Sequence, residues 1–503
     1  MKHALFGSVV AALVVAACGS TVQMHGSATL GSDGGTGLTA RGTGVGQSHA
    51  GLTGAGTAGG AGAGVAGGGG TVGGISSTAG QGPQGGPGGS PQLATAPPAG
   101  TTLAPIQVGI LLYPDLSAFA NTFGASADAG DQSLEVDTAV NWINTHGGAA
   151  GHQIQAVKHN VSLTSSDTYD QLAQQACQDF TADHHVVAVL APGTAVSDNF
   201  AACLQAKGVL LIDSGHWVHD ATDWKQYSNL FSPNEADGSA LGRAMVNQVL
   251  SRPLAKSGDK VGLMVMTEPG AVRTADNVVK PQLKAAGIEV VEYTVPPPAS
   301  TADISNSVSV DDSAELKMAS QGIHTVLFLC PGCLGFFAKN ADSQKYYPLY
   351  LGSSLDGPGG ITGSASNASM KTAIMLGYQP DSDIGLYTHP SELTDNPTRA
   401  LCKQIMAPSH QSSGDVSEFA TQAVCDGFLD VKYAAELNPA NPLTGPALQA
   451  GMGQFGSARP CALNFSTYLT SAQHGGDSSY RLMHWDSGSS TFVYDNTTRL
   501  AFR

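Results

Sequence analysis

Short apolar runs alternate with amphipathic stretches from residue 106 onward, and this alternation is the main structural signal of the sequence. Residues 108–113 form an unbroken apolar run that ends before Pro114, which is typical of a strand buried on both faces. A helix is expected after it, because apolar residues at positions 136, 139, 140 and 143 share one helical face. The glycines at 147 and 148 should end this helix. The order predicts an α/β fold with a parallel sheet, whose ligands bind at the carboxyl ends of the strands.

The same pattern recurs in two sets, separated by a short crossing at residues 230–233. Further strands are expected at residues 154–161, 186–190, 209–212, 261–266, 288–295 and 325–329. Helices are expected at residues 169–180, 197–207, 236–250, 272–286 and 314–320. Two Rossmann-like lobes in series are therefore predicted.

The first residues are typical of a secretory signal. Lys2 precedes an apolar run at residues 4–15, which is too short for a permanent membrane span. Residues 15–18 read V-A-A-C, which resembles the lipobox of bacterial lipoproteins, in which the cysteine is acylated and the preceding signal is removed. Residues 1–17 are thus interpreted as a lipoprotein signal peptide and Cys18 as the lipidation site, with an ordinary signal peptide as the alternative.

Residues 18–105 are dominated by Gly, Ala, Ser and Thr and are expected to form a flexible tether. A coil of this length has a mean span of about 50 Å. The formal net charge of −16 and the charged fraction of 12% argue against a nucleic-acid partner and against a polybasic membrane patch.

The chain has eight cysteines, which together with the signal indicates an oxidising compartment. If Cys18 is acylated, seven remain and at least one is unpaired. Disulfides are predicted between Cys177 and Cys203 and between Cys402 and Cys425, because each pair lies on successive predicted helices. The cysteines at 330, 333 and 461 are left open: the first two are predicted to pair with each other or with the third.

The order of elements and several local motifs resemble the type 1 periplasmic binding proteins, above all the leucine-binding group of ABC-transporter receptors. The resembling motifs are Phe123-Gly124, Ile143-Asn144, Gly147-Gly148, Gly151, residues 234–238, residues 284–288 with Val290-Val291, Gly322-Ile323, Leu351-Gly352 and Asp356-Gly357. The resemblance implies two lobes joined by a three-segment hinge. It places residues 106–232 and about 377–438 in lobe 1, and residues 233–376 and about 439–503 in lobe 2.

The resemblance also implies the ligand loops. Thr194, in a Pro-Gly-Thr loop before a predicted helix, is expected to bind an anionic group such as a carboxylate, although it can equally cap that helix. Gly215, His216 and Trp217 match a second ligand loop, here with bulkier side chains than the leucine-binding pattern. Phe123 takes the place of an aromatic residue that covers the ligand, with ordinary core packing as the alternative.

In the second lobe, Asp356 falls near an acidic residue that in the family pairs with the ligand's ammonium group. A buried charge needs such a partner, but an Asp-Gly turn explains the same residues. On the resemblance, the protein is expected to be an extracytoplasmic, lipid-anchored receptor in the periplasm or on the cell surface. It would present a small polar solute, an amino acid or related metabolite, to an ABC permease. The alternative is a surface-tethered sensor or interaction protein on the same fold.

Other chemistry finds little support in the sequence. The CxxC motif at Cys330 and Cys333 follows a strand, where a thiol of lowered pKa is found in redox proteins, but the order of elements is not that of thioredoxins. The pair His184-His185 lacks metal-ligand spacing. Neither a G-x-S-x-G elbow nor a P-loop occurs. The sequence therefore predicts a binding protein without enzymatic activity, metal or cofactor.

Overall fold

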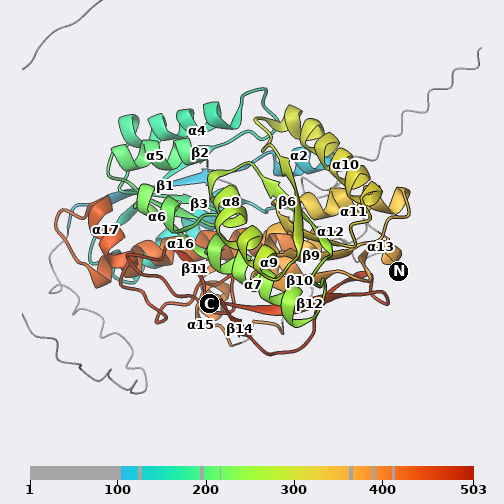
Figure 1. Cartoon of the computed structure of the whole chain (residues 1–503). Coiled ribbons are helices and arrows are strands. Elements are labelled where there is room, and N and C mark those ends of the chain that lie inside the picture. Colours follow the sequence, from blue (N-terminus) through green and yellow to red (C-terminus); the bar gives the residue numbers. More distant parts are fainter. Residues whose placement is uncertain are drawn as a thin grey trace, which may run out of the picture. The chain divides into compact units, whose positions relative to one another are not determined.

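The computed structural model describes residues 103–122, 127–192, 197–215, 217–361, 366–385, 387, 389, 391–393, 395–409 and 414–502 (Figure 1). The predicted signal peptide and tether lie outside these residues. Two sheets organise the described part, and each forms the centre of one lobe.

The first sheet is parallel throughout, with the strand order β11-β5-β4-β3-β1-β2. Its strands are β1 (Ile106–Leu112), β2 (Ile154–Asn160), β3 (Ala188–Ala191), β4 (Leu210–Asp213), β5 (Leu230–Ala236) and β11 (Gly475–Asp477). The chain changes direction across the sheet at β1, which pairs with both β2 and β3. In open parallel sheets the ligand site lies at the carboxyl ends beside such a switch point.

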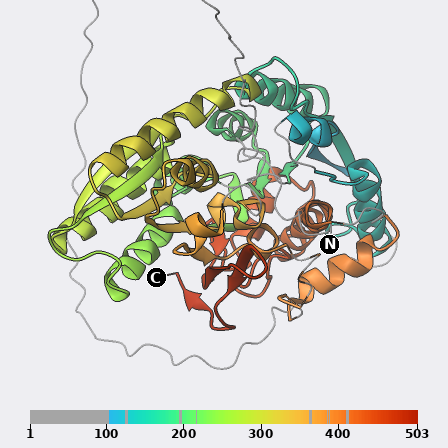
Figure 2. The same ribbon diagram turned by 90° about the vertical axis from the view of Figure 1, so that its right-hand side faces the viewer.

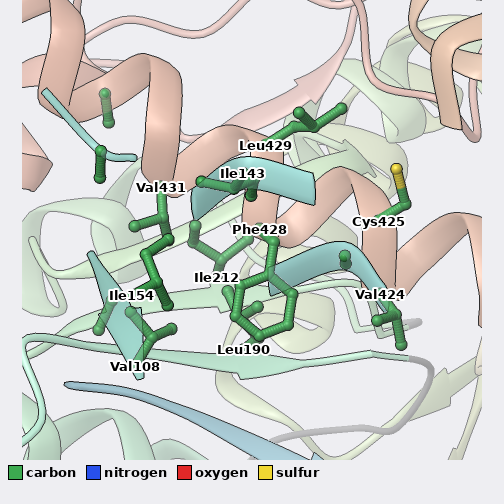
Figure 3. Packing of buried hydrophobic residues seen from close by; sticks show 14 of the residues in the cluster. Val108, Ile143, Ile154, Leu190, Ile212, Val424, Cys425, Phe428, Leu429 and Val431 are labelled. Carbon is green, nitrogen blue, oxygen red and sulfur yellow. The ribbon is translucent and has the colours of Figure 1, made fainter. Parts of the chain in front are cut away.

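Helices cover both faces of the first sheet. One face carries α3 (Gln132–Thr145), α15 (Pro397–Met406), α16 (Asp415–Leu437) and α17 (Gly445–Met452), and the other carries α4 (Tyr169–Gln178) and α5 (Asp198–Ala206). Phe428 of α16 packs with Val108 and Leu190 of two strands (Figure 3). Figure 2 shows the orange helices beside the blue start of the domain, and α3 contacts both α15 and α16. A late segment therefore completes the core of the first lobe.

The second sheet has the order β13-β12-β10-β9-β8-β6-β7, with β14 paired to β12. Its strands are β6 (Lys260–Met266), β7 (Glu289–Val295), β8 (Thr325–Leu329), β9 (Leu349–Ser353), β10 (Ile374–Gly377), β12 (Ser479–Asp486), β13 (Thr491–Tyr494) and β14 (Leu500–Ala501). Strands β6 to β10 are parallel and repeat the order of β1 to β5, whereas β12, β13 and β14 are antiparallel additions. The two lobes thus share one topology.

Alternation along β6 explains the packing of the second lobe. Leu263 and Val265 belong to the core cluster under α7 (Gly238–Ser251), α8 (Pro269–Thr274) and α9 (Lys280–Ala285). Met264 and Met266 belong to the cluster under α10 (Ile304–Ser320) and α11 (Cys333–Ser343). An apolar run buried on both faces is what a central parallel strand requires.

The chain passes between the sheets three times, after β5, after β10 and between β11 and β12. The predicted fold class, two lobes with parallel sheets, is confirmed. The boundaries differ from the expected ones in two places. Strand β5 stays in the first sheet to Ala236, beyond the predicted end at residue 232. The helix predicted for residues 314–320 begins at Ile304, because Ile304 and Val308 continue its apolar face.

The predicted return to lobe 2 near residue 439 is too early. Helix α17 contacts α16 and β4, and its Leu448 and Met452 belong to the core of the first lobe. Strand β11 then pairs with β5. The chain therefore joins the second sheet only after Asp477, because the apolar face of α17 is buried against α16 rather than against lobe 2.

Two disulfides link neighbouring helices of the first lobe. Cys177 of α4 is bonded to Cys203 of α5, and Cys402 of α15 to Cys425 of α16. These are the two pairs expected from the sequence. Each disulfide joins two helices that cover one face of the sheet, α4 and α5 on one face and α15 and α16 on the other.

Candidate ligand-binding site

The predicted ligand residues divide into those that the structure describes and those that it does not. Gly215, Trp217 and Asp356 are described. Phe123, Thr194, His216 and the lipidation site Cys18 lie outside the described residues. The described residues of the candidate site lie at the carboxyl ends of β4, β5, β6, β8 and β9.

Two carboxylates hold the loop after β4 in place. The Gly215 N–H donates to Oδ1 of Asp213 at 3.0 Å, and the Trp217 N–H donates to Oε1 of Glu235 at 3.0 Å. Asp213 ends β4 and Glu235 lies in β5, so neighbouring strands fix the loop from two sides. The Trp217 indole is half-buried, and its Nε1 has no acceptor among the described residues.

His219 lies at the centre of this arrangement and is buried. Its Nδ1 is 3.2 Å from Oε2 of Glu235. Burial acts to lower the pKa of His219, but the hydrogen bond and charge of Glu235, together with the charge of Asp213, raise it to about 9. Burial also raises the pKa of Asp213, and Glu235 adds to that rise. His219 is therefore an imidazolium at neutral pH, held between carboxyl groups.

Glu268 contributes a carboxyl group from the second lobe. It follows β6 and stands at the N-cap of α8, yet its side chain caps no backbone N–H. Only 9% of Glu268 is exposed, and neither carboxyl oxygen accepts a hydrogen bond from any described residue. Burial raises its pKa to about 8, although the nearby charge of His219 acts in the opposite direction. We call Asp213, Glu235 and Glu268, with the central His219, the carboxyl cluster.

An ion pair joins the lobes beside this cluster. Arg273 of α8 donates through Nε to Asp220 at 2.8 Å and through Nη2 to Asp223 at 2.5 Å. Both carboxylates belong to the segment around α6 (Ala221–Gln226) of the first lobe, where Asp220 also caps the helix. Arg273 binds both oxygens of Asp220 through Nε and Nη2 and one oxygen of Asp223 through Nη2, and the bidentate pair makes the contact geometrically specific. The lobes are thus fixed to each other near the first crossing.

Asp356 does not have the surroundings expected for a ligand-binding acid. It is fully buried, and its oxygens accept the N–H groups of Ser353 at 3.1 Å and Leu334 at 3.3 Å. Burial raises its pKa to about 7, and these two hydrogen bonds oppose the rise. Gly357 follows with a φ of 56°, so the structure shows the Asp-Gly turn that the sequence left as the alternative. Asp356 holds this turn to the start of α11.

The CxxC cysteines, left open by the sequence, pair with each other. Cys330 is bonded to Cys333 at the start of α11, while Cys461 is a free, buried thiol. Cys330 is fully buried and only 2% of Cys333 is exposed. Thiol–disulfide exchange needs an attacking thiolate to reach a sulfur atom, so this burial argues against the redox alternative.

Apolar side chains of both lobes meet in one buried cluster. Ile304 and Val308 of α10 and Phe336 of α11 come from the second lobe. They share the cluster with Leu116 and Phe119 of α2 (Leu116–Thr122) in the first lobe. All five side chains are less than one-tenth exposed. The lobes are therefore in contact through a buried, apolar interface.

Hydrogen bonds extend this interface. The Tyr169 N–H donates to the Ala299 carbonyl at 2.9 Å, and the Thr301 hydroxyl donates to the Leu163 carbonyl at 2.6 Å. In Figure 2 a long yellow helix reaches the teal helices of the first lobe. These contacts lie at loops after β2 and β7, so they can break without unfolding either sheet.

A separate pocket of about 280 Å³ lies between α15, α16 and the segment after α17. Its polar residue Arg459 is already paired with Asp426 at 2.6 Å and Asp430 at 3.0 Å. The pocket is lined by one lobe only and not by the residues at the strand ends. It is therefore a weaker candidate than the carboxyl cluster.

The described residues hold neither a metal site nor a membrane span. They contain no group of three His, Cys, Asp or Glu side chains arranged to bind a metal ion. Among the described helices, none combines the length and apolar character that crossing a bilayer needs.

The sequence from residue 105 to residue 490 matches the family model described as periplasmic binding protein. This match covers most of the chain, so the protein belongs to the periplasmic binding protein family. Members of this family bind ligands rather than convert them, which confirms the prediction that the protein is not an enzyme. The comparison with curated protein sequences gave no match.

Solved structures show the same fold. An ABC transporter substrate-binding protein from Aeropyrum pernix aligns with a TM-score of 0.58 at 13% identity, over 80% of this chain and 96% of that one. A branched-chain amino acid ABC transporter protein from Thermus thermophilus, with bound valine, aligns with a TM-score of 0.53 at 14% identity, over 78% of this chain and 95% of that one. An extracellular ligand-binding receptor from Verminephrobacter eiseniae aligns with a TM-score of 0.52 at 12% identity, over 78% of this chain and 100% of that one.

Sequence reasoning missed His219, Glu235 and Glu268 as site residues. Glu235 stood within a motif that carried the family resemblance, and Glu268 follows a predicted strand end within two residues. The signal in the sequence that could have identified them was their position at or just after the end of a predicted strand. Their burial was not visible, because isolated polar residues beside a turn are usually solvated.

Proposed function

We propose that this protein is the extracytoplasmic solute receptor of an ABC transporter and captures a small polar solute between its lobes. The observation that carries the proposal is that both lobes, which share one topology, contribute buried side chains to one polar cluster at their strand ends. Relatives of the same fold are named as ABC transporter proteins, and one holds valine. Amino acids and related metabolites are therefore the first solutes to test.

The mechanism is a population shift between open and closed lobes. Three crossings form a hinge, about which lobes of this kind rotate. A solute that contacts both lobes only when they are together binds the closed form more tightly, and so increases its population. The apolar cluster shared by the two lobes favours the closed form, since opening it exposes buried apolar area.

The proposal includes a lipid anchor at Cys18. Its support is the V-A-A-C motif at residues 15–18 and the Gly-rich segment of residues 18–105 that follows it. An acylated cysteine would hold the receptor at the outer side of the cell membrane, where its partner would be an ABC permease. The tether would let the lobes reach the permease while remaining attached.

Val308→Asp tests whether closure drives binding. Val308 is 3% exposed in the inter-lobe cluster, whereas Leu316 on the same helix is 53% exposed and makes Leu316→Asp a matched control. A charge at position 308 is tolerated only in water, so the lobes should separate. We expect a larger radius of gyration by small-angle X-ray scattering and about 30-fold weaker solute binding, if closure loses about 2 kcal/mol.

Solutes are found first by a thermal-shift screen of the full chain against amino acids and related amides. Binding at 100 times Kd adds about 2.7 kcal/mol of stability, which raises the melting temperature measurably. If Val308→Asp stays folded by circular dichroism but binds as tightly as Leu316→Asp, closure is not the mechanism. If no solute binds across the screen, the receptor proposal fails and the tethered sensor or interaction protein is favoured.

A further inference from the structure

We infer that the pocket between α15 and α16 binds a neutral, proline-containing segment of this chain's own predicted tether, residues 91–98. The segment reads P-Q-L-A-T-A-P-P and lies outside the described residues. The pocket is lined by the first lobe alone and lies away from the strand ends. The inference is therefore independent of the proposed function, because it concerns neither the solute nor the closure of the lobes.

The pocket has apolar and aromatic walls. Four large side chains form much of them: Leu401 of α15, Tyr433 and Leu437 of α16, and Phe455, which follows α17. At about 280 Å³ the pocket is close to the lower limit of ligand pockets, which is about 300 Å³, so it suits a few small groups. Grooves lined by aromatic side chains are one of the recurring sites that bind proline-containing segments.

The polar side of the pocket lacks an acceptor. Arg459 is 8% exposed and donates through Nη1 to the Thr398 hydroxyl at 2.9 Å, whereas its Nε has no acceptor among the described residues. Its Nη2 lies 2.6 Å from Asp426 and 3.0 Å from Asp430. The charge of the guanidinium is therefore already matched. A neutral acceptor, such as a peptide carbonyl oxygen, suits this pocket better than an anion.

Residues 91–98 have the composition that such a pocket favours. Three of these residues are prolines, which have no backbone N–H that binding could leave without a partner. Residues 50–112 contain no ionisable side chain, so the segment brings no charge to the pocket. The φ angles of Pro97 and Pro98 are fixed near −65°, and the segment therefore loses less conformational freedom on binding than a flexible one would.

The chain enters the first lobe beside the pocket. The Ala104 carbonyl oxygen is 2.7 Å from Nδ1 of His152. Nε2 of the same ring is 3.1 Å from the Ala440 carbonyl oxygen, and Ala440 follows Leu437 of the pocket by three residues. Three residues span at most about 11 Å, and the six residues that precede Ala104 reach up to about 20 Å. The two adjacent prolines are therefore within reach of the pocket.

The test is the binding of a fluorescently labelled peptide with the sequence of residues 90–100 to the full chain, measured by fluorescence anisotropy. Pro97→Ala with Pro98→Ala removes the rings of the chain's own segment and should free the pocket. Ala458→Trp is then added to fill the pocket, which the exposed Ala458 lines. Ala472→Trp, at an exposed alanine outside the pocket lining, is the matched control. Circular dichroism establishes that each variant folds.

We expect the peptide to bind the double proline variant, and to bind the wild-type chain at least about tenfold more weakly. The wild-type segment competes at the millimolar effective concentration that a short linker gives, so a peptide Kd of about 0.1 mM produces this ratio. Ala458→Trp should abolish binding to the double proline variant, and Ala472→Trp should leave it unchanged.

Equal binding to the wild-type chain and the double proline variant would overturn the inference, and so would binding that persists after Ala458→Trp. Absence of binding to the double proline variant at millimolar concentration would also overturn it, because the wild-type segment would then be mostly unbound. Sedimentation of the wild-type chain tests the other occupant. Self-association that Ala458→Trp removes would mean that a second copy supplies the segment, against the inference. These outcomes leave the solute screen unaffected, so the receptor proposal stands or fails separately.

Discussion

The most direct test of the buried electrostatics is Glu135→Gln in the first lobe, away from the proposed solute site. Glu135 lies in the first turns of α3 and is 1% exposed. Its Oε1 accepts a hydrogen bond from Thr421 of α16, and its Oε2 has no donor among the described residues. Burial raises its pKa from 4.5 to about 8; the Thr421 hydrogen bond opposes this rise, and the charges of Asp131, Asp128 and Glu418 add to it.

The sign and size of the effect follow from this shift. The folded protein keeps the Glu135 proton over a pH range in which the unfolded chain has lost it, so stability falls as pH rises through that range. The stability that comes from a protonated, buried Glu135 is fully present below the unfolded pKa near 4.5. It is lost as the pH rises from there to the folded pKa of about 8. At 1.36 kcal/mol per pKa unit, the largest loss is about 5 kcal/mol. Glutamine has no proton to lose, and it keeps the acceptor for Thr421.

The assay is thermal and urea unfolding of the full chain from pH 5 to pH 9, followed by circular dichroism. At pH 5 the wild-type chain and Glu135→Gln should unfold alike. At pH 9 the variant should be more stable by about 3 to 5 kcal/mol. Glu289→Gln, at an exposed carboxylate, controls for loss of a negative charge. Parallel pH profiles for the wild-type chain and Glu135→Gln would refute the reasoning.

Two further predictions concern covalent features. Replacing Cys177 and Cys203 together by alanine should cost about 3 to 4 kcal/mol in urea unfolding, because the bond closes a 26-residue separation; an unchanged midpoint would contradict this. Cys18→Ala should move the protein from the membrane to the soluble fraction when cells are separated by centrifugation, since acylation would be lost. A wild-type chain that is already soluble would contradict the anchor.

The sequence predicted the parts of the fold whose burial leaves a periodic pattern. Residues 108–113 were predicted as a strand buried on both faces and residues 261–266 as a strand, and the structure has β1 and β6 there. Helix α2 was missed, because its seven residues are too few to show a period. The prediction that α17 belongs to lobe 2 was wrong for a different reason. Its apolar face was readable, but a local pattern does not tell which sheet covers that face.

The site was less predictable than the fold. The loop at Gly215 and Trp217 was predicted to bind the ligand because it follows the fourth strand and matches a family loop; that role stays a prediction, and the structure ties the loop to Asp213 and Glu235. Asp356 was chosen by the same positional reasoning and is a turn residue. Sequence gives the order of polar residues after strands, whereas the partner of each carboxylate depends on contacts between lobes.

The carboxyl cluster and the apolar interface act in opposite directions on closure. The apolar cluster shared by the two lobes favours the closed form, because opening returns buried side chains to water. Burial of Glu268 opposes it, because a carboxyl group whose pKa is raised to about 8 by burial regains its ordinary ionisation when water enters. The apolar cluster and the buried carboxyl group therefore set the balance between open and closed forms, and a solute that contacts both lobes shifts that balance towards the closed form.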